Sequence, residues 1–594
     1  MNELKKRSSV DERFKWSIED LYKSDESWEK EFNTYTEKIN EITQYKNRLT
    51  VDNLAECLAL KDKIFEQVKK LYVYANLKGN EDSTNTKYQG YCIKADALIS
   101  HASNASAFIE PEILALDEDK LLAKLNSDSL NVYTHYIKDI LRSKKHILDS
   151  DKESLLAQFY EINSAPENIF GMLNNADISF PDVTDSRGEA HKLTHGTFIS
   201  LLQSSDRILR KNAFKALYET YYKQKNTIST IYTASVKKDI INAKIRNYNT
   251  ALDSCLFANN IPTEVYTNLI STVKKHLPLM HKYVALRKKC LKLDELNMYD
   301  LYTPIVEKAE TYIDYTTAKE TVLKSVAPLG KEYVDILSKA LNEEKWVDIY
   351  ENEGKRSGAY SWGSYGCHPF VSLNFNNNVD SMFTLAHEMG HAMHSHYTWS
   401  NQPFIYGDYT IFVAEVASTV NEALLMEYLL ANTTDKNQKM YLLNYYMEQF
   451  RGTLFRQTMF AEFELKIHTL IENGDSVTFT ELCEIYMELN REYYGSEITI
   501  DNEISWEWAR IPHFYTQYYV YQYATGYSAA IALSQKILKD NGAQAYINFL
   551  KSGSSKYSID LLKGAGVDMT TAEPINNAMK VFESVLTQIE NLIK

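Results

Sequence analysis

Two histidines and a glutamate in the stretch 380–394 have the types and the spacing of a metal-dependent hydrolase. His387, Glu388 and His391 form the pattern HExxH. The stretch is predicted to be a helix, with Asp380 as its N-cap and no proline inside it. Residues four apart share one helical face, so both imidazoles can bind one metal ion. Glu388 projects about 100° away and can accept a proton from water beside that ion. The helical periodicity rests on Met382, Leu385, Ala386, Met389 and Met393.

A third ligand for the ion is expected from the helical stretch 412–422. Glu415 stands there among small and apolar neighbours, where a buried carboxylate without a partner would be costly. Two histidines and one glutamate leave a fourth position open for water, which predicts one catalytic Zn²⁺ per chain. Glu422 lies seven residues after Glu415, hence on the same face. It is either the acceptor for the free ring N–H of a ligand histidine or a surface glutamate.

Hydrogen-bond donors that could stabilise an oxyanion are concentrated in residues 510–527. This span contains His513 and six tyrosines. The chain has 43 tyrosines in all, so composition explains part of the cluster. We expect at least one of these side chains to contact a substrate.

The residues before the HExxH helix predict a small antiparallel sheet beside it. Residues 346–350 are predicted as a strand, and 359–362 and 370–375 as paired strands around a turn. An extended peptide can add to the edge of such a sheet through main-chain hydrogen bonds. The alternative is a stabilising hairpin without a ligand. Next to a metal-binding helix, we expect substrate contact at Gly363, Ser364 and Tyr365.

Helical patterns dominate the rest of the chain, so the expected fold class is mainly α. Only 20 glycines and 11 prolines occur among 594 residues, which favours long helices. We predict an N-terminal helical domain over residues 1–200 and a helical catalytic domain over residues 201–594. His191 and His195 are also four apart, but no glutamate follows the first and their setting is loop-like. We expect both to be surface residues.

Composition limits the classes of partner and the compartment. The net charge is −14 and no basic stripe occurs, which disfavours nucleic-acid binding. Six cysteines without CxxC spacing are typical of reduced thiols in a cytoplasmic protein. No signal peptide and no membrane span are expected, because the first 16 residues lack an apolar core and no run approaches 18 apolar residues. The oligomeric state stays open.

Four separated segments together resemble oligoendopeptidase F, of the thimet oligopeptidase superfamily. The resemblance covers essentially the whole chain, because overall length and the N-terminal residues 14–16 and 20–22 also match. It implies a large, mostly helical, two-lobed body that encloses a deep channel, and cytoplasmic cleavage of short peptides with folded proteins excluded. The four segments, in the family's order, are GKRSGAY (354–360), HEMGHAMH (387–394), FVAEVAS (412–418) and IPHFY (511–515).

The resulting hypothesis is a zinc-dependent endopeptidase of the oligopeptidase type. One alternative is a carboxydipeptidase of the angiotensin-converting-enzyme type, which also uses HEMGH on a helical scaffold but is typically exported. Another is a helical peptide-binding protein without catalysis, against which the intact glutamate of the motif argues. The resemblance implies that the zinc ligands are His387, His391 and Glu415 and that the catalytic carboxylate is Glu388. It implies that the transition-state donors are His513, Tyr521 and Tyr515.

Overall fold

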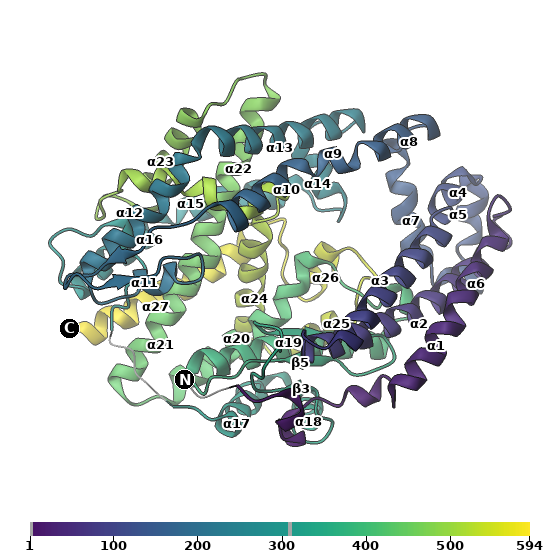
Figure 1. Cartoon of the computed structure of the whole chain (residues 1–594), viewed down its shortest axis with the longest axis horizontal. Coiled ribbons are helices and arrows are strands. Elements are labelled where there is room, and N and C mark those ends of the chain that lie inside the picture. Colours follow the sequence, from purple (N-terminus) through teal and green to yellow (C-terminus); the bar gives the residue numbers. More distant parts are fainter. Residues whose placement is uncertain (1–3, 307–311) are drawn as a thin grey trace. The chain divides into compact units, whose positions relative to one another are not determined.

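The computed structural model describes residues 4–306 and 312–594 and divides into two compact units (Figure 1). Unit 1 comprises Met1–Lys145, Glu310–Tyr428 and Leu533–Val567, and unit 2 comprises His146–Ala309, Leu429–Ala532 and Asp568–Lys594. Each unit is assembled from three chain segments, because helices far apart in the sequence pack together. The division predicted at residue 200 does not coincide with a boundary of these units.

The predicted mainly α fold class is confirmed, since helices carry almost all the regular structure in both units. Two helices, α20 (Ile411–Asn432) and α24 (Tyr521–Lys539), each cross a unit boundary. The remaining helices of unit 1 are α1 (Asp25–Lys38), α2 (Leu54–Glu81), α3 (Thr86–Ser106), α4 (Ile109–Ala115), α5 (Glu118–Lys124), α6 (Asp128–Asn131), α7 (Thr134–Ser143), α17 (Tyr315–Ser325), α18 (Lys331–Asn342), α19 (Val379–Asn401), α25 (Ala543–Leu550) and α26 (Ser558–Gly564).

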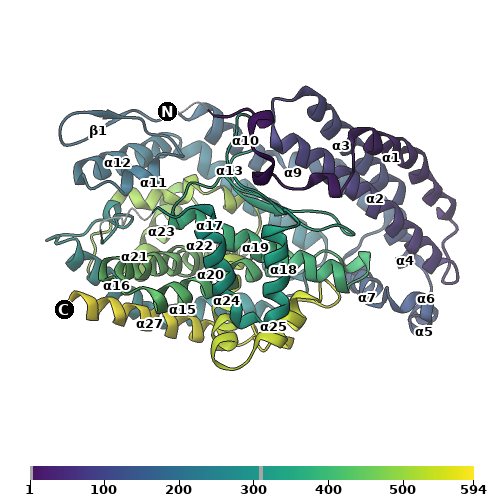
Figure 2. The ribbon, with the colours of Figure 1, turned by 90° about the horizontal axis from the view of Figure 1, so that it is seen from below.

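Unit 2 contains longer helices that pack on one another. Helices α15, α16 and α21 all contact the C-terminal helix α27, and Figure 2 shows α15 and α16 beside it. The helices of unit 2 are α8 (Ser150–Gln158), α9 (Tyr160–Asn163), α10 (Ala165–Met172), α11 (Phe198–Leu202), α12 (Arg207–Lys223), α13 (Lys225–Ile245), α14 (Ala251–Phe257), α15 (Thr263–Lys275), α16 (Leu277–Cys290), α21 (Lys436–Gln449), α22 (Arg456–Glu472), α23 (Phe479–Tyr494) and α27 (Glu573–Ile593).

Helices α1, α2 and α3 lie side by side in unit 1 (Figures 1 and 2). Trp28 of α1 is fully buried against α2 and α3, where its ring stacks on Tyr91 at 4.1 Å and its indole N–H donates to the carbonyl of Leu71 at 2.9 Å. A buried indole needs such a partner for its polar edge. These helices form a continuous core that also includes Phe370 of the sheet described next.

A three-stranded sheet precedes α19 and packs against it, as predicted. Its strands are β3 (Val347–Asp348), β4 (Tyr360–Trp362) and β5 (Phe370–Ser372), in the order β3-β5-β4. The prediction of an antiparallel sheet is right for β4 and β5 but wrong for β3, which pairs with β5 in parallel. The chain leaving β3 turns back through Gly354 and Gly358, which have φ of +76° and +84°. It then forms β4, and β5 lies between β3 and β4 and pairs with both.

A second sheet in unit 2 is an antiparallel hairpin, formed by β1 (Val183–Thr184) and β2 (Ala190–His191). None of the helices in residues 4–306 and 312–594 combines the length and the apolar character that a bilayer crossing requires.

Candidate metal centre

Helix α19 carries the HExxH motif in its third and fourth turns. The helix begins after Asn378, whose side-chain oxygen accepts a hydrogen bond from the N–H of Ser381 at 2.8 Å. The predicted cap Asp380 instead lies in the first turn, where its charge favours the positive end of the helix dipole. The cap is two residues earlier because Asn377 adopts a positive φ of +53° and Asn378 is extended.

Gly390 allows α20 to approach α19 at the motif itself. A Cβ at this position would lie 2.6 Å from Cα of Ser418 and 2.7 Å from the carbonyl oxygen of Ala417. Both are backbone atoms of α20, so any larger residue would separate the two helices. This role was not predicted, although a glycine inside a helical pattern is a signal of close backbone approach.

The close approach brings the three predicted ligands together within unit 1. Oε2 of Glu415 lies 3.3 Å from Nε2 of His387 and 3.4 Å from Nε2 of His391. One donor atom from each of the three side chains falls within 4.8 Å of the others. Zinc bonds of about 2.1 Å at tetrahedral angles place donor atoms about 3.4 Å apart. The residues present therefore fit a zinc ion in both donor type and spacing.

Hydrogen bonds hold two of these ligands in orientation. Glu422 accepts a hydrogen bond from Nδ1 of His387, which is the first of the two roles that the sequence left open for it. This contact leaves Nε2 as the ring nitrogen available to a metal. The hydroxyl of Ser418 donates to Oε2 of Glu415 at 3.0 Å. Ser418 was not predicted, although its position three residues after Glu415 on the same helix would have indicated it.

The electrostatics of the centre favour a bound cation. Burial alone would lower the pKa of His387, but its hydrogen bonds to Glu415 and Glu422 raise it to about 10. Burial would raise the pKa of Glu415, but the two imidazoles hold it well below its usual range. Glu415 and Glu422 thus stabilise positive charge on the imidazole rings. A bound dication can supply that positive charge in place of the ring protons.

Glu388 lies on α19 between the two histidines and is only 7% exposed. Burial raises its pKa above the ordinary value for a glutamate. A carboxylate with a raised pKa is a better acceptor and donor of protons near neutral pH than an exposed one. This environment suits a general base.

The two further histidines of the motif region, His394 and His396, do not belong to the group of potential metal ligands. His394 is 1% exposed and its ring stacks on Tyr409 at 3.8 Å. Burial lowers the pKa of His394 to about 3, so it is neutral. His396 packs against Trp346, with ring centroids 5.4 Å apart. Both are packing residues.

The predicted substrate-contact segment lies at the end of β4, beside the last turns of α19. A Cβ at Gly363 would lie 2.8 Å from the ring of Trp399. The hydroxyl of Tyr365 donates to the carbonyl of Gln402 at 2.8 Å. Ser364 is 4% exposed, and its hydroxyl has no hydrogen-bond partner among the described residues.

In unit 2 the structure pairs His513 with two tyrosines that the sequence analysis did not select. His513 is exposed on the short 3₁₀ helix η12 (Pro512–Tyr515). Its Nε2 lies 3.3 Å from the hydroxyl of Tyr523, and its ring stacks on Tyr519 at 5.7 Å. Burial and the charge of Arg456 lower the pKa of His513, which favours the neutral ring.

The tyrosines that were selected are interior residues of unit 2. Tyr515 is 4% exposed and stacks on Phe170 at 4.4 Å, and Tyr521 is 2% exposed and packs against Tyr266 at 5.1 Å. The structure does not bring either hydroxyl to His513. The turn at Tyr518, which has a φ of +46°, interrupts the helical register on which sequence spacing would depend.

A second group of potential ligands occurs on the β1–β2 hairpin. Asp185, Glu189 and His191 bring three ligand atoms within 4.8 Å of one another. Arg187 already pairs with Asp185 at 3.3 Å and with Glu189 at 3.1 Å, so its guanidinium offsets part of the negative charge of this group. His195, four residues on, is exposed as predicted.

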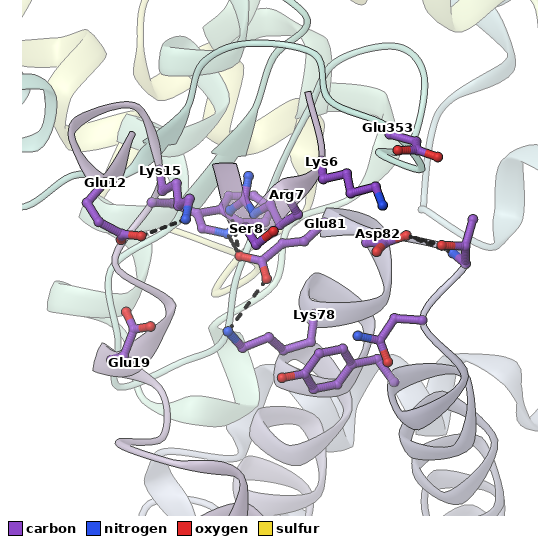
Figure 3. Close-up of a pocket in the computed structure, with 14 residues that line it drawn as sticks. Lys6, Arg7, Ser8, Glu12, Lys15, Glu19, Lys78, Glu81, Asp82 and Glu353 are labelled. Carbon is purple, nitrogen blue, oxygen red and sulfur yellow. Dashed lines mark hydrogen bonds and ion pairs between the residues drawn. The ribbon is translucent and has the colours of Figure 1, made fainter. Parts of the chain in front are cut away.

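Side chains that take part in ion pairs and hydrogen bonds line a cavity of about 580 Å³ near the N-terminal segment (Figure 3). Arg7 pairs with Glu81 at 2.7 Å and with Asp348, and the indole N–H of Trp16 donates to Glu81 at 2.7 Å. Both acidic and basic side chains line the cavity, and Figure 3 shows Lys78 linked to Glu81. These contacts fasten the N-terminal segment to α2 and the sheet. None of the predicted site residues lines this cavity.

Comparison with protein families gives two matches along the chain. The model of peptidase family M3 matches residues 200–581, and the model described as oligopeptidase F matches residues 112–180. The first match includes all the residues of the candidate metal centre and the whole span 510–527.

Individual proteins are similar over almost the full length. Oligopeptidase PepF of Bacillus subtilis is 50% identical, over 100% of this chain and 89% of the relative. Group B oligopeptidase PepB of Streptococcus agalactiae is 42% identical, over 99% and 98%. A crystal structure of oligoendopeptidase-F from Enterococcus faecium has a TM-score of 0.74 and 38% identity, over 96% of this chain and 99% of that one. A crystal structure from Chlamydophila abortus has a TM-score of 0.94 and 36% identity, over 99% and 100%.

Proposed function

The chain belongs to peptidase family M3 and is a metalloendopeptidase, and from this premise we propose that it uses one zinc ion to hydrolyse internal bonds of short peptides. The observation that carries the choice of zinc is the donor set. Two imidazole nitrogens and one carboxylate oxygen, spaced by 3.3 and 3.4 Å, match a catalytic zinc site with one open position. Hard ions such as Mg²⁺ and Ca²⁺ prefer oxygen ligands and suit this set less well.

In this proposal His387, His391 and Glu415 hold the ion. When bound, zinc supplies Lewis-acid activation of water and of the peptide carbonyl. Glu388 takes a proton from the attacking water on its carboxylate and passes it to the leaving amine. Its burial supports the second step, since a carboxylate with a raised pKa retains the proton for long enough to deliver it.

We also propose that His513 and Tyr523 donate hydrogen bonds to the oxyanion of the transition state. In unit 2, Nε2 of His513 and the hydroxyl of Tyr523 lie 3.3 Å apart, and the His513 side chain is exposed. This assignment replaces the two buried tyrosines of the sequence analysis with one that contacts the imidazole. Preorganised donors of this kind contribute about 10²–10³ in kcat.

The preference for short peptides is supported by the names of the relatives, which are oligopeptidases and oligoendopeptidases. The deep channel, the exclusion of folded proteins and a cytoplasmic location belong to the same proposal. The six free thiols fit a reducing compartment.

Metal removal and reconstitution test the proposal. The protein is stripped with a chelator and titrated with Zn²⁺, and cleavage of an internally quenched ten-residue peptide is followed by fluorescence and mass spectrometry. We expect activity to return at one zinc per chain, with cuts at internal bonds. Release of C-terminal dipeptides alone would show a carboxydipeptidase, and absence of cleavage at full zinc loading would show a binding protein.

A further inference from the structure

We propose that a cavity beside β4 is a subsite for one apolar side chain of the substrate, three or four residues before the cleaved bond. This inference rests on the proposed function. The cavity has a volume of about 200 Å³ and lies within unit 1, between α2, α3, the end of β4 and the last turn of α19. Its walls include Tyr72, Val73, Ile99, Trp362, Trp399 and Phe404.

The lining favours apolar groups because aromatic rings form much of it and its two charged side chains are paired. The indole N–H of Trp399 donates to the carbonyl of Gly407 at 2.9 Å, so the ring presents only carbon to the cavity. Lys69 and Asp408 at the rim pair with each other at 2.6 Å. No unpaired charge is thus left in the wall for a charged side chain. Burying an apolar side chain among aromatic rings is favourable, whereas burying a charged one is costly.

Ser364 supplies an independent sign of a ligand at this wall. Its side chain is buried and its hydroxyl has no hydrogen-bond partner among the described residues. Buried hydroxyls in folded proteins nearly always have a partner. The backbone of a peptide lying along the segment 363–365 would provide one.

The position of β4 explains how a peptide side chain would reach the cavity. β4 is at the edge of the sheet, so its outer backbone groups are available to an added strand. Residues opposite each other on neighbouring strands direct their side chains to the same face. Trp362 faces α2, where its ring contacts Tyr72 edge-on at 5.9 Å. A peptide residue paired with Trp362 therefore directs its side chain into the cavity.

Helix geometry gives the distance from the cleaved bond. Trp399 lies eight residues after His391 on α19, which is about 12 Å along the helix. An extended peptide advances about 3.3 Å per residue, so the cavity is three or four residues away.

The direction of β4 indicates on which side of the cleaved bond the substrate residue in the cavity lies. β4 runs in the same direction as α19: the carbonyl of Gly358 accepts from Asn374, just before α19 begins, and Gly363 contacts Trp399 near its end. Antiparallel pairing is the more stable arrangement. A peptide antiparallel to β4 therefore has its cavity residue on the N-terminal side of the cut.

Peptides that differ in the position of one phenylalanine test the subsite. A single phenylalanine is moved through an otherwise alanine and glycine sequence around one cleavable bond, and kcat/KM is measured for the zinc-loaded enzyme. We expect about a tenfold gain when phenylalanine is third or fourth before the cut, and no gain for lysine or aspartate there. Equal rates at all positions, or a gain only next to the cut, would overturn the proposal.

Variants of Ile99 connect the gain to this cavity. Ile99→Trp fills the space and Ile99→Glu adds a carboxylate. In each variant the ratio of kcat/KM for the phenylalanine peptide to kcat/KM for the all-alanine peptide should fall to about one. Ile93→Trp is the control, because Ile93 is on the same helix, 69% exposed and outside the cavity. If the Ile99 variants fold, as judged by thermal unfolding, and keep the gain, the subsite is elsewhere. If no peptide is cleaved at full zinc loading, the proposed function fails instead.

Discussion

Replacing Gly390 by alanine should weaken zinc binding and hydrolysis, although alanine is the better helix former. The added Cβ would lie 2.6 Å from Cα of Ser418, whereas ordinary contacts begin at 3.4 Å. The difference means that α20 must move by about 0.8 Å. Metal–ligand distances tolerate only about 0.2 Å, and Glu415 is carried on the helix that moves. We therefore expect at least a tenfold loss of zinc affinity and about a 100-fold loss of kcat/KM.

The same substitution elsewhere in unit 1 provides the control. Gly90 lies in α3 with nothing within 4 Å of an added Cβ, so Gly90→Ala should stabilise the protein by up to about 1 kcal/mol. Zinc affinity is measured by competition with a chromogenic chelator, and stability by thermal unfolding of the metal-free protein. If Gly390→Ala bound zinc as tightly as wild type and was stabilised like Gly90→Ala, the close approach of the two helices would not be what forms the centre.

Three other predictions concern the proton acceptor, the oxyanion donors and the interior of unit 2. Glu388→Gln should bind zinc normally but lose about 10²–10⁴ in kcat, whereas His387→Ala should lose both; wild-type kcat in the first variant would exclude the base assignment. Tyr523→Phe should lower kcat by about 10²-fold with little change in KM, and Tyr515→Phe, which removes a buried unpartnered hydroxyl, should leave both unchanged; the reverse result would restore the sequence-based choice. Burial of Glu507 raises its pKa, but two neighbouring arginines outweigh this and lower it from 4.5 to about 2. The stability that this glutamate contributes is therefore present above pH 4.5 and lost as the pH falls towards 2. Glu507→Gln should remove that part of the acid sensitivity, measured as the thermal midpoint between pH 6 and pH 2, and an unchanged pH profile would contradict it.

The metal centre could be predicted because helical spacing determines which side chains share a face. His387 and His391 at i and i+4, and Glu415 and Glu422 at i and i+7, needed only the assumption that both stretches are helical. The distance between the two helices was not predictable in the same way. It depends on Gly390, and a single glycine in a helical pattern does not say which backbone approaches it.

Loops and sheet order were the parts that local patterns did not determine. His513 lies on a 3₁₀ helix, and Tyr518 with its positive φ stands between it and Tyr519 and Tyr523, so spacing along the chain did not tell which hydroxyl meets the imidazole. In the sheet, the alternation of residues predicted the strands, but the insertion of β5 between β3 and β4 depends on how the chain turns at Gly354 and Gly358. The N-cap of α19 was displaced by the same kind of effect, at Asn377.

Anomalous X-ray diffraction at the zinc edge, from crystals of the zinc-loaded protein, tests whether these three side chains bind one zinc ion. We expect a single peak in unit 1, about 2.0–2.2 Å from Nε2 of His387, Nε2 of His391 and a carboxylate oxygen of Glu415. A peak bound to other residues, or one with Glu415 beyond bonding distance of the ion, would contradict it.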